Sequence, residues 1–323
     1  MILVVSDSFV NWKILLARVF QVIGPAAIPM AFTLTAQAYF MSINIAFLTL
    51  ILVVFTGCVA HVYEDMFIHS IPGNQLIDGM VSGTQWEFRS HYISRPKNVQ
   101  LYAVLFARPA PKALILYFGG NSFMISKYYQ RILDAYENQP VDVLLVDHRG
   151  YGGSTGVASM TGLLEDATAV YDYARNLPNY QNNPVIVHGQ SLGSFMAGEV
   201  SKVRTLDGLV LESSATTVED WLQGFVDDSV FISRGVVEGS LKGKGNLSVM
   251  ASLDEHVLLV VGEKDTMTRS DMSAKLFKTA GVPSDWKELL VVPGAGHKNA
   301  ALSEEYSKAF TRLLIRIGHI NSR

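Results

Sequence analysis

The chain has 323 residues and a formal net charge of −3, and 49% of its residues are hydrophobic while only 17% are charged. Its mass of 35.5 kDa is enough for one large α/β domain or two small ones. Because the charge is slightly acidic and no basic run is present, we expect no nucleic-acid partner. The single cysteine, Cys58, excludes an intrachain disulfide and any cysteine-based metal site.

The hydrophobic excess lies at the front of the chain. Residues 19–63 contain no Asp, Glu, Lys or Arg, and residues 38–62 are almost wholly apolar. About 20 such residues span a bilayer as a helix, so residues 1–62 are predicted to hold a single-pass membrane anchor. Lys13 and Arg18 precede the apolar run, which places the rest of the chain outside the cytoplasm. A second, proline-broken membrane element before that run would reverse this orientation.

The end of the apolar run has a second interpretation. Small residues and a lone cysteine close it, as in Phe55-Thr56-Gly57-Cys58, and this pattern resembles a bacterial lipoprotein signal with lipid attached at Cys58. The run begins far from Met1, and no basic residue lies close before it. We therefore favour a plain anchor helix and keep a lipoprotein tethered at Cys58 as the alternative. Both interpretations tether the protein to a membrane.

The remainder of the chain is predicted to be a linker at residues 63–84 and one α/β domain at residues 85–323. Aromatic residues alternate with polar ones in 85–93, which predicts an antiparallel strand paired with 100–106. Beyond this hairpin, apolar strands alternate with helical patterns, which is typical of a mostly parallel sheet with helices on both faces. The predicted strands are 113–118, 141–146, 185–188, 206–211, 257–261 and 289–292, and the predicted helices include 163–174 and 306–317.

A strand, a sharp turn and a helix are predicted around Ser191. The segment Val185–His188 is apolar and β-branched, the chain turns at Gly189-Gln190-Ser191-Leu192-Gly193, and helical spacing follows. This is the context of a Gly-x-Ser-x-Gly nucleophile elbow, in which a strained backbone exposes the serine hydroxyl. The two glycines let the strand and helix approach closely. Ser191 is therefore the predicted nucleophile, and the backbone N–H of Leu192 is a predicted oxyanion donor.

A serine hydroxyl needs a base that takes its proton and a carboxylate that orients the base. His297 follows the last predicted strand in a glycine-rich loop, and the other seven histidines lie in less suitable places. Asp265 follows the strand at 257–261, and Glu263 and Glu212 are its competitors. Carboxyl ends of parallel strands meet at one edge of a sheet, so the sequence predicts a site of Ser191, Asp265 and His297 there.

The second oxyanion donor is expected in the turn after the first parallel strand. Gly119-Gly120-Asn121-Ser122 forms a glycine-rich turn with uncovered backbone amides, and either Gly120 or Asn121 can supply the N–H group.

These residues, with the elbow His188–Gly193 and the loop Asp147-His148-Arg149-Gly150-Tyr151-Gly152-Gly153-Ser154, resemble an α/β-hydrolase of the serine-aminopeptidase-like (S33) and Bem46-like branch. The resemblance runs from about residue 85 to the C-terminus. It implies an α/β-hydrolase fold with a small lid, a serine hydrolase that works through an acyl-enzyme, and no metal or organic cofactor. It also implies a structural role for Asp147 and Arg149. Relatives often have His-Gly in the oxyanion turn, where this chain has Phe118-Gly119.

The lid is expected at about residues 214–253. Its Trp221 and Phe225 are candidates for lining an acyl or aromatic pocket, although they could instead pack the lid onto the core. The predicted function is a membrane-tethered serine hydrolase acting on ester, thioester or lipid acyl substrates. A serine aminopeptidase is the alternative enzyme, with Asp227 and Asp228 as candidates for holding the substrate amine. A catalytically silent binding module is the alternative outside enzymes, and only the altered oxyanion turn supports it.

Overall fold

The computed structural model describes residue 43 and residues 58–75, 85–230 and 232–321. Most of the predicted anchor at residues 1–62 therefore lies outside the described residues, but its last five residues, Cys58–Val62, form a strand and not the end of a membrane helix. Contacts divide the chain into a unit of residues 1–58 and a unit of residues 59–323, and the description below concerns the second. Within the described ranges, no helix has both the length and the apolar character needed to cross a membrane.

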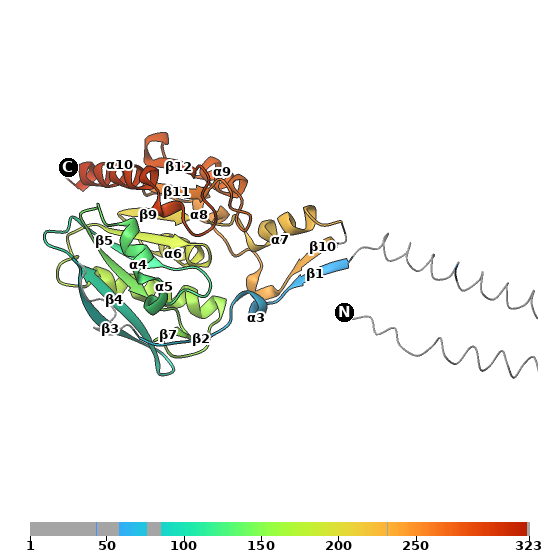
Figure 1. Cartoon of the computed structure of the whole chain (residues 1–323), viewed down its shortest axis with the longest axis horizontal. Helices are drawn as coiled ribbons and strands as arrows, with labels where there is room; N and C mark the ends of the chain where they lie inside the picture. Colours follow the sequence, from blue (N-terminus) through green and yellow to red (C-terminus); the bar gives the residue numbers. More distant parts are fainter. Residues whose placement is uncertain (1–42, 44–57, 76–84, 231, 322–323) are drawn as a thin grey trace, which may run out of the picture. The chain divides into compact units, whose positions relative to one another are not determined.

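An eight-stranded sheet runs through the second unit, in the order β12-β11-β9-β8-β5-β6-β4-β3 (Figure 1). The strands from β12 to β6 are parallel to one another, and the hairpin of β3 and β4 adds two antiparallel strands beside β6. The strands are β3 (Glu87–Arg95), β4 (Val99–Ala107), β5 (Ala113–Phe118), β6 (Val141–Val146), β8 (Val185–Gln190), β9 (Gly208–Glu212), β11 (Val257–Gly262) and β12 (Lys287–Val292).

Helices cover both faces of this sheet, and each face has its own hydrophobic core. Every residue of β5, β6, β8, β9 and β11 is buried, as expected of central parallel strands. Helices α5 (Met160–Arg175), α6 (Leu192–Val203), α8 (Leu247–Ala251) and α9 (Ser270–Thr279) contribute to one core, and α4 (Ile125–Ala135) and α10 (Glu304–Asn321) contribute to the other. The predicted α/β-hydrolase architecture is confirmed.

Residues 63–75 differ from the predicted linker because they pack against the domain. They follow β1 (Cys58–Val62) and contain α3 (Glu64–Phe67) and β2 (Ile71–Pro72). The short strand β2 pairs with β7 (Tyr151–Gly152), and Ile68 between α3 and β2 is only 2% exposed. The apolar side chain of Ile68 joins the core on the α5 and α6 face, which explains why this segment is ordered against the domain.

The lid region contains α7 (Val218–Asp227), β10 (Ile232–Val237), a short 3-10 helix η2 (Gly239–Leu241) and α8. Strand β10 pairs with β1 in a separate two-stranded sheet, so the predicted lid is joined to the chain segment that precedes the domain. Figure 1 shows α7, β10 and β1 extending together from the body of the domain. We call the group formed by β1, α3, α7 and β10 the cap.

Candidate active site

Ser191 lies at the turn between β8 and α6, as the sequence predicts. Its backbone has φ 54° and ψ −119°, a conformation that costs energy for any residue with a side chain. The backbone N–H of Ser191 donates to the carbonyl oxygen of Glu212 on the neighbouring strand at 2.9 Å, which fixes the turn against the sheet. The strained turn lifts the hydroxyl away from the strand.

Two glycines make this turn possible. A Cβ at Gly189 would lie 2.3 Å from the carbonyl oxygen of Gly193, and a Cβ at Gly193 would lie 2.0 Å from the carbonyl oxygen of Phe118. Real Cβ atoms do not approach backbone oxygen atoms so closely, so any larger residue would push β5, β8 and α6 apart. Both glycines therefore have the steric role expected from the sequence.

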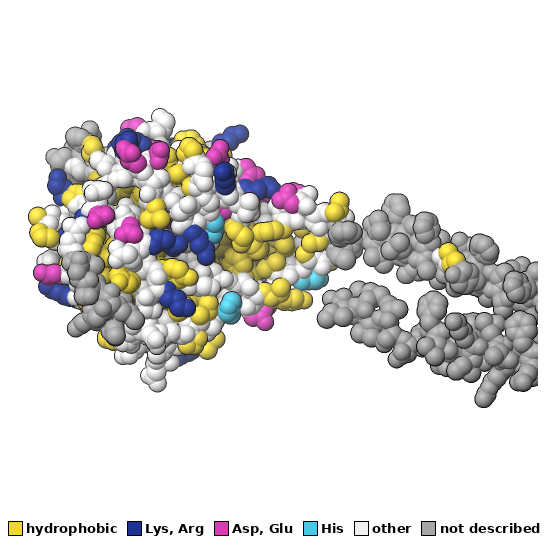
Figure 2. Space-filling model, in the orientation of Figure 1, with side chains coloured by type: hydrophobic (Ala, Val, Ile, Leu, Met, Phe, Trp, Pro, Cys, Tyr) yellow, Lys and Arg dark blue, Asp and Glu magenta, His cyan; other side chains and the backbone are white. Residues whose placement is uncertain are grey.

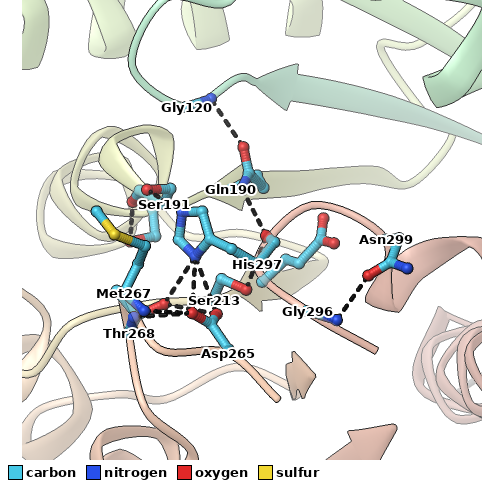
Figure 3. Close-up of polar contacts among 12 residues, drawn as sticks. Gly120, Gln190, Ser191, Ser213, Asp265, Met267, Thr268, Gly296, His297 and Asn299 are labelled. Atoms are coloured by element: carbon cyan, nitrogen blue, oxygen red, sulfur yellow. Dashed lines mark hydrogen bonds and ion pairs between the residues drawn. The ribbon is translucent and has the colours of Figure 1, made fainter. Parts of the chain in front are cut away.

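The structure brings Ser191, His297 and Asp265 together in one hydrogen-bonded row (Figure 3). Nε2 of His297 lies 3.0 Å from Oγ of Ser191, and Nδ1 lies 3.0 and 2.9 Å from the two carboxylate oxygens of Asp265. With Nδ1 donating to the carboxylate, Nε2 is left as an acceptor for the serine proton. This is the geometry that a base needs in order to activate a serine hydroxyl.

Asp265 is held by several donors in a buried position. The backbone N–H groups of Met267 and Thr268 donate to its Oδ1, each at 2.9 Å, and Oγ1 of Thr268 donates to its Oδ2 at 2.9 Å. Burial by itself raises the pKa of this carboxyl, but the hydrogen bonds from His297 and Thr268 outweigh it and place the pKa below its ordinary value. Asp265 is therefore ionised at neutral pH, as the orienting group must be.

The two competing carboxylates lie elsewhere. Oε2 of Glu212 is 3.4 Å from Nε2 of His188, on the buried side of the nucleophile strand. Oε2 of Glu263 accepts from the backbone N–H of Gly294 at 2.8 Å and is part of the turn after β12. Of the three candidate acids, Asp265 is the one that contacts His297.

The oxyanion turn is tied to the elbow by Gln190. The N–H of Gly120 donates to Oε1 of Gln190 at 3.1 Å, and Nε2 of Gln190 donates to the carbonyl oxygen of His297 at 3.2 Å (Figure 3). This hydrogen bond engages the N–H of Gly120, and the second oxyanion donor, Gly120 or Asn121, stays a prediction. The bond arises because β5 and β8 are neighbours, with Phe118 beside Gly189.

A buried histidine from the loop after β6 also supports the oxyanion turn. Nε2 of His148 donates to the carbonyl oxygen of Gly119 at 2.7 Å, and burial lowers the pKa of His148 to about 4, so the ring is neutral at neutral pH. The adjacent Asp147 accepts from the backbone N–H groups of Ile125 and Gly153 at 2.7 and 2.8 Å. The hydrogen bond from His148 thus holds the turn at Phe118-Gly119, and Asp147 ties the loop after β6 to the start of α4.

A cavity of about 220 Å³ opens above Ser191 and His297. Leu192 and Phe195 of α6 line its inner part, and Trp221 of α7 lines it from the cap. Phe225 is 40% exposed and lies behind Trp221, with ring centroids 4.8 Å apart, and it is not among the lining residues described. The structure therefore places Trp221 at the pocket and Phe225 one layer outside it.

The sequence analysis missed several pocket residues, among them Met66 and Phe67 of α3. The sequence pattern that could have indicated these residues is the short apolar run Met66-Phe67-Ile68 after Glu64-Asp65. This run is too brief to distinguish a packed turn of helix from a linker. It also missed Thr268, whose Oγ1 lies 2.9 Å from Asp265 and 3.2 Å from Nδ1 of His297. A threonine three residues after an aspartate is a common turn pattern and could have suggested this contact.

Comparisons with known proteins agree with this architecture. A family model described as "Serine aminopeptidase, S33" matches residues 109–239. An uncharacterized protein of Mycobacterium tuberculosis is 30% identical over 162 residues, which are 50% of this chain and 55% of that protein. The protein bem46 of Schizosaccharomyces pombe is 25% identical over 215 residues, or 64% of this chain and 68% of that protein. The chain thus spans about half the length of the mycobacterial relative.

Among solved structures, an esterase of Pyrococcus furiosus has a similar fold, with a TM-score of 0.59 and 17% identity over 77% of this chain and 98% of the esterase. These comparisons support the α/β-hydrolase fold, and the chain is similar to the serine aminopeptidase family model over residues 109–239 and to bem46.

Proposed function

We propose that the protein is a membrane-tethered serine hydrolase that cleaves ester, thioester or lipid acyl substrates through an acyl-enzyme. The observation that carries the proposal is the row Asp265–His297–Ser191, with 3.0 Å between Nε2 of His297 and Oγ of Ser191, at the floor of an apolar pocket. The domain is proposed to lie outside the cytoplasm, held by the N-terminal apolar segment, with a lipid at Cys58 as the alternative tether.

The proposed reaction follows from this geometry. His297 takes the hydroxyl proton of Ser191 as Oγ attacks the substrate carbonyl carbon. The backbone N–H groups of Leu192 and Asn121 are proposed to stabilise the resulting oxyanion. His297 then gives its proton to the leaving group, which departs and leaves the acyl group on Ser191. Water, deprotonated by His297, then attacks the acyl-enzyme; the bond between Oγ and the acyl carbon breaks, His297 returns the proton to Oγ of Ser191, and the carboxylic acid is released.

The walls of the pocket favour an acyl substrate over a charged amine. The lining residues include Phe67, Phe195 and Trp221, and no Asp or Glu belongs to the lining within the part of the chain that the structure describes. Asp227 and Asp228, the candidate amine ligands, are exposed, and Asp228 lies 3.5 Å from Arg269. An aminopeptidase would need a carboxylate facing the pocket to hold its substrate's amine. It remains the second candidate because the matching family model carries that description.

A fluorophosphonate probe tests the proposed nucleophile. Membranes containing the full-length protein should show labelling of the wild type and of Ser94→Ala, which alters an exposed serine on β3. Ser191→Ala should show none. Labelling that survives in Ser191→Ala would refute the assignment, and an unlabelled, stably folded wild type would favour a silent binding module. Parallel assays with p-nitrophenyl esters and with amino-acid p-nitroanilides separate the esterase from the aminopeptidase.

A further inference from the structure

One wall of the pocket comes from a segment that directly follows the apolar N-terminal run. Met66 and Phe67 of α3 line the pocket together with residues of α6, and Phe67 meets Trp221 of α7 edge to face at 5.4 Å between ring centroids. Nδ2 of Asn121 donates to the carbonyl oxygen of Phe67 at 3.1 Å, which ties α3 to the oxyanion turn. The mouth of the pocket is therefore built partly from residues that immediately follow β1.

The cap and the pocket rim expose a group of large apolar side chains. Figure 2 shows hydrophobic atoms gathered on the part of the molecule that carries α3, α7, β1 and β10. Val230, just before β10, is 93% exposed, and Met66 is 65% exposed. Exposed apolar patches on a domain surface mark interaction sites. The group, which we call the apolar rim, consists of Val59 (47% exposed), Tyr63 (50%), Met66 (65%), Phe225 (40%), Val230 (93%) and Met267 (45%).

The chain itself indicates what covers this rim. The sequence from 38 to 57, directly before β1, has the composition of a bilayer-spanning segment. The distance along the chain from residue 58 to Met66 is at most about 30 Å, even if every residue were fully extended. The pairing of β1 with β10 fixes the lid to the same short segment. An anchor in the membrane thus keeps the apolar rim close to the bilayer surface.

We propose that the apolar rim rests on the lipid bilayer, so that acyl substrates enter the pocket from the membrane. This inference rests on the proposed membrane tether, and it goes further in assigning the face of the domain that contacts lipid. The affinity of the apolar rim for the bilayer comes from burying its exposed apolar side chains in the interfacial region, as for other proteins that lie on a membrane.

The charges around the rim are of both signs. Asp65 on α3 and Asp227 and Asp228 at the end of α7 are exposed carboxylates. Arg269 is 3.5 Å from Asp228, and Arg234 on β10 and Lys264, three residues before Met267, are exposed. Since charges of opposite sign offset each other beside a surface, the contact is expected to depend on the apolar side chains, and a zwitterionic phosphatidylcholine surface is enough to test it.

A fluorescent probe on the rim tests the contact directly. The full chain with Cys58→Ser and Val230→Cys, labelled with an environment-sensitive fluorophore, is reconstituted in phosphatidylcholine nanodiscs. The matched control is Ile315→Cys, at a residue of α10 that is 55% exposed, and Figure 1 shows α10 away from α7, β10 and β1 of the cap. We expect a blue shift and quenching by nitroxide-labelled lipid at position 230 and neither at position 315.

Each other outcome overturns the inference. A probe at 230 that behaves like the one at 315 shows a rim exposed to water. A blue shift without quenching by the labelled lipid shows that residues 1–57 or a second copy covers the rim. Co-purification with nanodiscs is measured separately for the wild type and for the labelled Cys58→Ser variants, so that a failed tether, including one lost with Cys58, is recognised as such.

A charge on the rim tests the route of the substrate. Val230→Asp should lower the hydrolysis of a long-chain ester embedded in the nanodisc several-fold and leave a short soluble ester unchanged, whereas Ile315→Asp should change neither. Equal rates on the embedded ester for Val230→Asp and wild type would overturn the route. If wild type hydrolyses neither ester, the proposed hydrolase activity has failed, and the probe measurement still decides the contact.

Discussion

The residues beneath Ser191 and the cap above it are held in place by different contacts. Beneath the serine, polar side chains are buried and bonded: His148 to Gly119 and Gln190 to Gly120. The loop after β6 is anchored by Asp166, whose side chain is 6% exposed and lies 2.6 Å from Arg149. The cap is held mainly by the pairing of β1 with β10, by ring contacts such as Phe67–Trp221 and by exposed ion pairs, with a hydrogen bond from Asn121 to Phe67.

This difference separates the chemistry from the choice of substrate. A catalytic row works only if its atoms are held within fractions of an ångström, and buried, fully bonded groups provide that precision. Apolar contacts between α3 and α7 have no directional preference and can adjust around chains of different length. We call the buried residues beneath Ser191, such as His148, Asp166 and Gln190, the floor. Substitutions in the floor should therefore affect turnover and folding. Substitutions in the cap should affect which substrates are accepted.

The largest effect is expected from Asp265→Asn. Asparagine keeps the size of the side chain and can still accept from Thr268, but it cannot hold His297 in the tautomer that leaves Nε2 free to accept. We expect kcat to fall by about 10³–10⁴-fold with little change in melting temperature. The control is Glu263→Gln, which alters a carboxylate bonded to Gly294 and should keep near wild-type activity. An equal loss in both variants would contradict the assigned acid.

Two glycine substitutions compare the packing around the elbow with that around η2, which follows β10 of the cap. In Gly193→Ala the new Cβ would lie 2.0 Å from the carbonyl oxygen of Phe118, whereas at Gly239 in η2 beside β10 no atom lies within 4 Å. We expect Gly193→Ala to lower the free energy of unfolding by about 3 kcal/mol or more, and Gly239→Ala to change it by about 0.5 kcal/mol or less. Chemical denaturation followed by circular dichroism measures both, and similar losses would remove the proposed contrast.

Phe67→Ala should change substrate preference while leaving the chemistry intact. Removing this ring takes away apolar surface that a long acyl chain would contact, so kcat/KM for a long-chain p-nitrophenyl ester should fall about tenfold, or about 1.4 kcal/mol. The value for p-nitrophenyl acetate should stay the same. Phe225→Ala is the matched control, because Phe225 lies behind Trp221. A parallel loss on both esters would place Phe67 in the catalytic framework instead.

The same difference between the floor and the cap explains which parts of the structure could be predicted from the sequence. The central strands at 113–118 and 141–146 were predicted with the bounds observed, because buried parallel strands leave a continuous apolar signal. The row of Ser191, Asp265 and His297 could be proposed because each residue follows a strand end, and strand ends meet at one edge of the sheet.

The cap could not be derived in this way. The short helix α3 has no periodicity of its own, and its place at the pocket depends on the pairing of β1 with β10, which lie about 170 residues apart in sequence. The use of the Gly120 amide by Gln190 was also invisible, since it depends on a side-chain rotamer reaching across from β8 to the turn after β5.

The smallest effect is expected from an ion pair that links α7 of the cap to α9. Asp220 lies 2.7 Å from Lys275, and the hydrogen bonds from Lys275 and Thr216 lower the pKa of Asp220 below its ordinary 3.8. Such a depressed pKa contributes stability that is present above pH 3.8 and is lost as the pH falls through the folded-state value. Because both side chains are substantially exposed, solvent screens the pair.

A double-mutant cycle of Asp220→Asn and Lys275→Met measures this pair. We expect a coupling free energy of about 0.2–1 kcal/mol at neutral pH and low salt, which disappears at about 1 M salt and at acidic pH. Denaturation of the four proteins under each condition gives the coupling. A coupling that persisted in high salt would mean that α7 is fixed as firmly as the floor, and the proposed adjustment of the cap around different acyl chains would then be wrong.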